Sequence, residues 1–248
     1  MPLPAKAFQL WLHVVAPSVS TADICRISGI KRTTLAQQLV RGKVAENTLV
    51  SISRALKRSP LEDLASFEGY AELARRPQPP TAAELVSQIA TMDLLRAVIS
   101  RSSPAYGGYG DDGSALTPAL GPAPHATSVR NWVDAIDDGE LRHRVSDATG
   151  IAPQNYSAQL TANRLSPELA VATARAAGVG FTGGLVATGL ITEAEAGWPP
   201  EAKQTALDAL SDGELTALAG ERLQALGKTL RRQEHEHEQT KTIWENLG

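Results

Sequence analysis

The sequence contains few of the residues that stabilise disulfide-rich or β-sheet domains. Of its 248 residues only Cys25 is a cysteine, and 4% are aromatic. A single cysteine excludes an intrachain disulfide and is typical of proteins from a reducing compartment such as the cytoplasm. Scarce aromatic residues and the lack of alternating β-branched runs disfavour sheets, while abundant alanine and leucine favour helices. We therefore expect an all-α protein.

The sequence also lacks a hydrophobic run long enough to cross a membrane. The apolar stretch near the N-terminus is short and is interrupted by Gln9 and His13, which is not typical of a signal peptide. No later stretch approaches the roughly 18 apolar residues of a membrane-spanning helix. We therefore expect a soluble cytoplasmic protein with no membrane partner.

Residues for a catalytic, cofactor or metal site do not gather anywhere in the sequence. The segment 178–183, GVGFTG, has the glycine spacing of a dinucleotide-binding loop, but it follows an expected helix and not a strand. His235 and His237 are two residues apart, whereas zinc ligands on one helix face are four apart. We expect no enzyme activity, no cofactor and no metal.

The sequence does contain a duplication. A shift of 121 residues aligns residues 11–101 with residues 132–222 without a gap and gives 13 identities, among them Trp11 with Trp132. Many mismatched positions remain apolar in both halves. These are Leu12/Val133, Val15/Ile136, Ile24/Val145, Leu35/Tyr156 and Val44/Leu165. A chance alignment would not keep the core positions in register, so we expect two similar helical modules.

The two modules are separated by a segment rich in helix-breaking residues. Residues 102–126 contain five glycines and four prolines, a composition typical of flexible linkers. We therefore expect an N-terminal module over residues 1–101, a flexible linker over 102–126 and a second module over 127–248. The charged residues at the C-terminus are expected to extend the last helix.

Charge is distributed unevenly between the modules. The whole chain has a net charge of −3. Residues 1–104 carry 13 Lys/Arg and 8 Asp/Glu, a net charge of +5, which leaves −8 for the remainder. Residues 26–58 hold eight basic residues and one acid, while the equivalent window 147–179 holds two of each. Only the first module therefore has the positive charge that a phosphate-binding surface requires.

The basic window contains a helix-turn-helix pattern, SGIKRTTLAQQLVRGKV, at residues 28–44. Gly29 is expected to join a helix ending near Ile27 to a helix over residues 32–40. The pattern resembles the lambda-repressor-like, Cro-type helix-turn-helix family, in particular the repressors of actinobacteria and their phages. The resemblance covers residues 20–65 and, more loosely, residues 141–186.

In that family the helix after the turn enters the major groove of double-stranded DNA, and residues at its start contact the bases. The residues to which the resemblance gives base contacts are Lys31, Arg32, Thr33, Thr34 and Gln37. The residues placed for phosphate contacts are Ser20, Thr21, Arg41 and Lys43.

The second module keeps the turn but changes the side chains, with TGIAPQNYSAQLTANRL at residues 149–165. Gln154 and Asn155 would project from the start of its helix, and both can pair with adenine. Asn163 and Arg164 could contact the DNA backbone. Because positive charge is scarce here, this module either contacts DNA as well or serves for contacts within the protein.

We therefore expect a transcriptional repressor, of the phage immunity type by resemblance, that acts by promoter occlusion. With two tandem modules in one chain, we expect a monomer on an asymmetric operator, with a homodimer as the alternative. The competing hypothesis is an antitoxin-like or partner-binding regulator whose second module is a protein-interaction or dimerisation domain.

Overall fold

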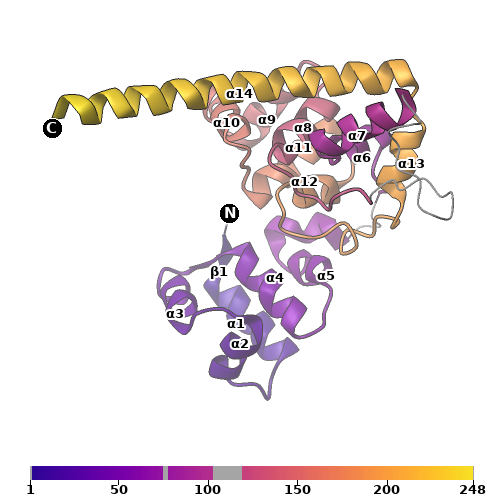
Figure 1. The fold of residues 1–248 in the computed structure, drawn as a ribbon. Coiled ribbons are helices and arrows are strands. Elements are labelled where there is room, and N and C mark those ends of the chain that lie inside the picture. Colours follow the sequence, from indigo (N-terminus) through magenta and orange to yellow (C-terminus); the bar gives the residue numbers. More distant parts are fainter. Residues whose placement is uncertain (1, 75–77, 103–118, 248) are drawn as a thin grey trace, which may run out of the picture. The chain divides into compact units, whose positions relative to one another are not determined.

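The computed structural model describes residues 2–74, 78–102 and 119–247, and side chains as far as residue 239. The described chain is all-α, which confirms the expected fold class (Figure 1). Contacts divide it into two compact units. Unit 1 comprises Met1–Gln88 and Pro122–Lys203, and unit 2 comprises Ile89–Gly121 and Gln204–Gly248. Among the described helices, none combines the length and apolar character needed to span a membrane.

Unit 1 begins with a helical bundle that we call copy one, residues 2–74. Its helices are α1 (Ala5–Val15), α2 (Thr21–Ser28), α3 (Arg32–Val40), α4 (Glu46–Ala55), α5 (Pro60–Ala65) and the 3-10 helix η1 (Glu68–Ala74). A short antiparallel pair, β1 (Leu3–Pro4) with β2 (Lys43–Val44), ties the N-terminus to the end of α3. This pairing was not expected, because two-residue strands leave no alternating pattern in the sequence.

Copy two, residues 127–198, repeats the five α-helices of copy one in the same order, with no counterpart of η1. They are α8 (Ser128–Ile136), α9 (Leu141–Thr149), α10 (Pro153–Thr161), α11 (Pro167–Ala177) and α12 (Phe181–Ala187). Each lies within two residues of the position given by the shift of 121. The turns also match, because Gly29 and Gly150 both end their helices in the left-handed conformation, with φ of 71° and 70°. The duplication is therefore visible in the backbone as well as in the sequence.

The buried residues of the two copies occupy equivalent positions. Phe8, Ile24 and Leu35 in copy one correspond to Val129, Val145 and Tyr156 in copy two, and all six are at most 2% exposed. The apolar positions that stayed in register in the sequence therefore form the two cores.

The expected helix over residues 82–101 is instead two helices, α6 (Ala82–Ser87) and α7 (Thr91–Ser102). The break lies at Gln88, whose buried amide donates hydrogen bonds to Ser87 Oγ (2.9 Å) and to the Ser128 carbonyl (3.2 Å). These bonds hold α6 against α8 within unit 1. The next residue, Ile89, is buried in the core of unit 2. A helical period cannot show that two neighbouring residues belong to different cores.

Unit 2 consists of α7, α13 (Ala202–Asp208) and α14 (Asp212–Leu247). Its core contains Ile89, Leu94, Leu207, Leu215 and Ala219. Figure 1 shows α14 as one continuous helix alongside α7, so the charged tail does extend the last helix as expected. The Arg101 guanidinium donates to the carbonyls of Leu207 (2.8 Å) and Leu210 (2.6 Å), which satisfies the C-terminus of α13.

Most of the expected linker, residues 103–118, lies outside the described residues. Its last residues pack on unit 1, because the Ala123 amide donates to Glu193 (2.9 Å) and the His125 ring bonds to the Ser87 carbonyl (3.0 Å). The expected domain boundaries at residues 101 and 127 were drawn from the repeat. The contacts between helices group the chain differently, because α6 packs on α8 of copy two and α7 packs on α14.

Candidate nucleic-acid interface

Helix α3 is attached to copy one along a single edge. Leu35 is its only buried residue, at 1% exposed. The half-buried Gln38 side chain accepts hydrogen bonds from the Ala45 amide (3.2 Å) and the Thr48 hydroxyl (3.0 Å), which ties the end of α3 to α4. The opposite face is exposed. It carries the predicted base-contacting residues Arg32, Thr33, Thr34 and Gln37, with Lys31 as the N-cap residue.

The residues predicted to contact phosphates lie at the ends of α2 and α3 and are exposed. Ser20 is the N-cap of α2: its hydroxyl oxygen accepts from the Asp23 amide (3.1 Å) and the hydroxyl donates to the Asp23 carboxylate (2.7 Å). Thr21 is the first residue of α2, Arg41 is the C-cap of α3, and Lys43 lies in β2. All nine residues predicted for copy one are therefore accessible to a ligand.

Three of the eight basic residues between 26 and 58 are engaged in ion pairs. Arg26 pairs with Asp23 (2.9 Å), and the Arg58 guanidinium pairs with the buried Asp63 (2.7 Å). Arg54 pairs with Glu195 of copy two. The other five make no ion pair within the described residues; they are Lys31, Arg32, Arg41, Lys43 and Lys57. Four of these five flank or begin α3, so the available positive charge is concentrated at that helix.

In copy two, α10 presents the two expected amide side chains. Gln154 and Asn155 are exposed, while Tyr156 and Leu160 are buried and hold the helix to the core. The Tyr156 hydroxyl shares a hydrogen bond with Thr173 (3.0 Å), and burial raises the pKa of Tyr156. The exposed amides therefore lie on a helix that two buried side chains hold against the core.

Asn163 serves the protein's own backbone. It adopts a left-handed conformation with φ of 50°, where copy one has Gly42 at 74°. Its Oδ1 accepts hydrogen bonds from the amides of Val129 (2.9 Å) and Arg130 (3.3 Å), which caps the first turn of α8. The side-chain oxygen expected to face DNA is thus already engaged. Arg164, the next residue, is exposed.

The other arginines of copy two are paired with acids. Arg130 and Arg142 both contact Asp134 (3.6 and 3.5 Å), and Arg142 also contacts Asp137 (3.4 Å). Arg144 contacts Asp138 (3.0 Å), and its hydrogen bond is the main cause that lowers the pKa of Asp138. Copy two therefore offers much less uncompensated positive charge than copy one.

The two copies contact each other within unit 1 through two ion pairs, each between an arginine of one copy and an acid of the other. Arg54 binds Glu195 with two hydrogen bonds of 2.7 Å and also donates to the Leu190 carbonyl (3.2 Å). Arg175 binds Glu72 of η1. The hydrogen bond from Arg54 is the main cause that lowers the pKa of Glu195. Arg54 belongs to the basic window 26–58 and Arg175 to the neutral window 147–179, and the sequence showed the acidic partner of neither.

The glycines of the segment 178–183 serve packing and helix ends. Gly178 ends α11 in the left-handed conformation, and Gly180 is the N-cap of α12. A Cβ on Gly183 would lie 2.2 Å from a carboxylate oxygen of Glu84, so this position must be small. The segment follows helix α11, as expected from the sequence.

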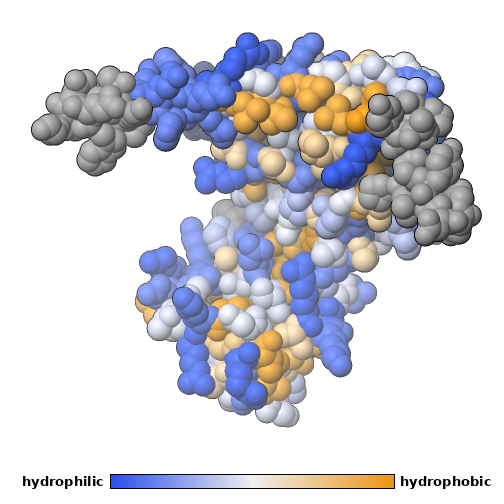
Figure 2. Space-filling view, in the orientation of Figure 1, coloured by the Kyte–Doolittle hydropathy of each residue, from blue (hydrophilic) through white to orange (hydrophobic). Residues whose placement is uncertain are grey.

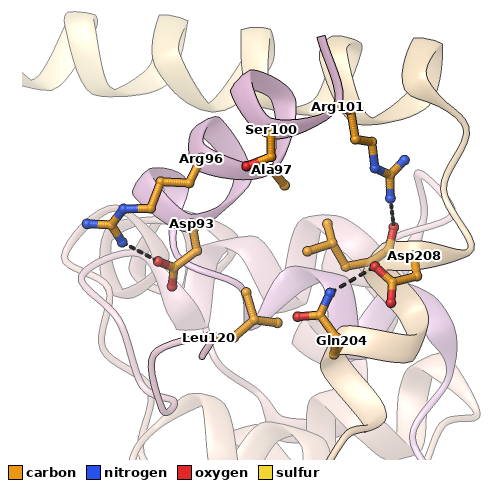
Figure 3. Close-up of a pocket in the computed structure, with 9 residues that line it drawn as sticks. Asp93, Arg96, Ala97, Ser100, Arg101, Leu120, Gln204 and Asp208 are labelled. Atoms are coloured by element: carbon orange, nitrogen blue, oxygen red, sulfur yellow. Dashed lines mark hydrogen bonds and ion pairs between the residues drawn. The ribbon is translucent and has the colours of Figure 1, made fainter. Parts of the chain in front are cut away.

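A surface cavity of about 170 Å³ lies in unit 2 between α7 and α13 (Figure 3). Its charged side chains already have partners: Asp93 pairs with Arg96 (2.7 Å), and Asp208 accepts from Gln204 (2.8 Å). No group of three or more potential metal ligands occurs in the part of the chain that the structure describes. The exposed face of α3 is therefore the strongest candidate site.

In comparisons with known proteins, no family model, curated protein or solved structure matches this chain.

Proposed function

We propose that this protein is a sequence-specific transcriptional repressor that binds double-stranded DNA through α3 of copy one. Three features of α3 together support the proposal. The helix buries only Leu35, it presents several exposed hydrogen-bonding side chains, and it is flanked by cations that make no ion pair within the described residues. A helix of about 10 Å diameter held along one edge fits the major groove of B-DNA.

The exposed side chains of α3 suit base recognition. The Arg32 guanidinium can donate two hydrogen bonds to guanine, and the Gln37 amide can pair with adenine. The methyl groups of Thr33 and Thr34 can pack on the thymine methyl group. Lys31, Arg41 and Lys43 would neutralise phosphates on either side and fix the register of the helix on the duplex.

In copy two, Gln154 and Asn155 would contact a second half-site. Because most arginines of this copy are ion-paired, we expect its contribution to be mainly in sequence preference and less in affinity. Occupation of a promoter by the protein would exclude RNA polymerase. The resemblance to Cro-type proteins makes a cytoplasmic phage immunity repressor our specific proposal, and this role requires binding without catalysis.

The test is a selection of bound sequences from a random DNA pool, followed by affinity measurements over a series of salt concentrations. We expect one enriched sequence and a steep loss of affinity with salt, because binding releases counterions from phosphates. Lys228→Ala, on the exposed surface of α14, is the matched control and should not change the salt dependence. A pool without enrichment, or binding that is insensitive to salt, would contradict the proposal.

A partner-binding regulator is the second candidate, and the ion pairs of copy two favour it. Arg130, Arg142, Arg144 and Arg175 all have acidic partners, so α10 lies on a nearly neutral surface. In that case α10 would contact a protein, and substitution of Gln154 and Asn155 would leave every base preference unchanged.

A further inference from the structure

Helix α14 carries an apolar stripe beyond the part that packs on α7. Leu215 and Ala219 are buried in the core of unit 2, but the next large apolar residues are exposed. They are Leu223, Leu226 and Leu230, at 43%, 40% and 47% exposed. Figure 2 shows this hydrophobic surface along the middle of α14, bordered by hydrophilic side chains. Spacings of three and four place the three leucines on one face of the helix.

The stripe has the heptad spacing of a coiled coil. With Leu223 and Leu230 at position a and Leu226 at position d, Gln233 and His237 take the next d and a positions. Between residues 223 and 239, no large apolar residue falls outside positions a and d. This stripe is narrower than the apolar face of a helix that packs on a globular core.

We propose that a second copy of this chain covers the stripe, so that two α14 helices form a parallel coiled coil. In this arrangement a residue at position g faces position e of the next heptad on the partner. In the sequence Glu236 takes position g and Lys241 takes position e of the next heptad, so these two positions carry opposite charges. The preceding g to e pairs, Arg222 with Gly227 and Thr229 with Glu234, bring no like charges together.

Gln233 favours the same arrangement. In a parallel pair in register, Gln233 of one chain faces Gln233 of the partner chain, and the amide of one can donate to the oxygen of the other. Polar residues at core positions, here Gln233 followed by His237, fix register at a cost in stability. The leucine layers on the N-terminal side of Gln233 supply the apolar burial.

Pairing also accounts for the length of α14, which runs for 36 residues. An isolated helix is only marginally stable in water, because it gains little beyond its own backbone hydrogen bonds. A second helix along the stripe would bury Leu223, Leu226 and Leu230, which are 40–47% exposed in the single chain. The resulting homodimer would contain copy one and copy two from each of its two chains.

The test is the mass of the full chain by sedimentation equilibrium over a series of concentrations. We expect the mass to rise from 26.3 kDa towards twice that value. Leu226→Glu with Leu230→Glu should remain at the monomer mass, because charges at a and d oppose burial. Gln224→Glu with Gln239→Glu adds the same charge at exposed outer positions and should dimerise like the wild type.

A wild-type chain that stays monomeric, or a leucine variant that still dimerises, would overturn the proposal. In a Trp244→Phe background all remaining tryptophans lie in unit 1, and unfolding followed by tryptophan fluorescence should then be unchanged for both variants, which separates lost pairing from misfolding. Orientation is tested with Gln233→Cys in a Cys25→Ser background. A parallel pair in register forms an interchain disulfide under mild oxidation, and a dimer that forms none would refute the parallel arrangement.

Discussion

Arg54 and Arg175 occupy equivalent positions of the repeat, and each binds an acid of the other copy. Arg54 of α4 reaches Glu195, which follows α12, while Arg175 of α11 reaches Glu72 in η1, which follows α5. The two acids are not equivalent, because Glu195 corresponds to Ala74, and Glu72 corresponds to Glu193, which binds Lys203. Within unit 1 the copies therefore contact each other through equivalent arginines but different acids, so the contact is not strictly two-fold.

This contact should weaken at low pH. The pKa of Glu195 is lowered by Arg54, so the pair contributes to stability above the ordinary glutamate pKa of about 4.3 and loses this contribution as the pH falls through the lower folded-state value. The Arg54 side chain is 42% exposed, and screening limits the effect to about 1 kcal/mol or less. Urea unfolding of wild type and Glu195→Gln at neutral and acidic pH measures it. The difference between them should shrink on acidification, whereas Glu68→Gln, at an exposed site, should show no such trend.

Glu84 lies in α6, outside copy two, and is expected to stabilise copy two. Its Oε1 accepts from the buried Trp132 indole (3.1 Å), and its Oε2 accepts from the Thr81 amide (3.0 Å). Glu84→Ala leaves the indole N–H without an acceptor and should cost about 1 to 3 kcal/mol in urea unfolding. Glu84→Gln keeps an acceptor oxygen and should lose less. Equal losses in the two variants would show that the hydrogen bond to Trp132 is not what Glu84 contributes.

Gly184→Ala should destabilise the protein although it lies within a helix. Alanine is favoured over glycine in helices by about 1 kcal/mol. However, a Cβ at Gly184 would lie 2.7 Å from the Trp132 ring and 3.1 Å from the Ala170 carbonyl oxygen, and overpacking costs about 1 to 3 kcal/mol. Gly220→Ala, with no atom within 4 Å of the added Cβ, is the control and should stabilise α14. Thermal unfolding by circular dichroism checks both, and an increase in the melting temperature of Gly184→Ala would refute the steric argument.

Arg32→Ala and Lys43→Ala should weaken DNA binding in different ways. Arg32 lies at the start of α3, so its loss should relax preference at one base position and cost about 1 to 3 kcal/mol on the selected sequence. Lys43 lies beyond the helix, and its loss should weaken all sequences alike and reduce the salt slope by about 1. Competition binding with selected and random DNA separates the two patterns. Equal losses of specific and random binding for Arg32→Ala would reject Arg32 as a base contact.

Gln154→Ala combined with Asn155→Ala tests whether copy two contacts DNA. In the intact chain we expect unchanged affinity for random DNA and relaxed preference in one half of the selected site, because these amides carry no charge. The half-sites should differ in sequence, since copy one presents Arg32 where copy two has Pro153. A selected sequence that is identical for the variant and the wild type would favour the partner-binding function of copy two.

The sequence alone determined the local structure of this protein. The boundaries of α3 and α10, the left-handed turns at Gly29 and Gly150 and the buried apolar positions all follow from helix period and glycine chemistry, which act over a few residues. The exposure of Arg32, Thr33 and Thr34 was predictable for the same reason, because a residue's side of a short helix depends on its neighbours in the sequence.

Only the tertiary structure decided which distant residues meet. In copy one the Trp11 indole donates to Asp63 (3.2 Å), but the equivalent of Asp63 in copy two is Gly184, and Trp132 turns instead to Glu84. The arginines show the same dependence on tertiary structure. The sequence predicts both Arg32 and Arg54 to be basic surface residues, but of the two only Arg54 forms an ion pair within the described residues. Partners 48 to 141 residues away leave no local pattern, because they are selected by packing and not by helical period.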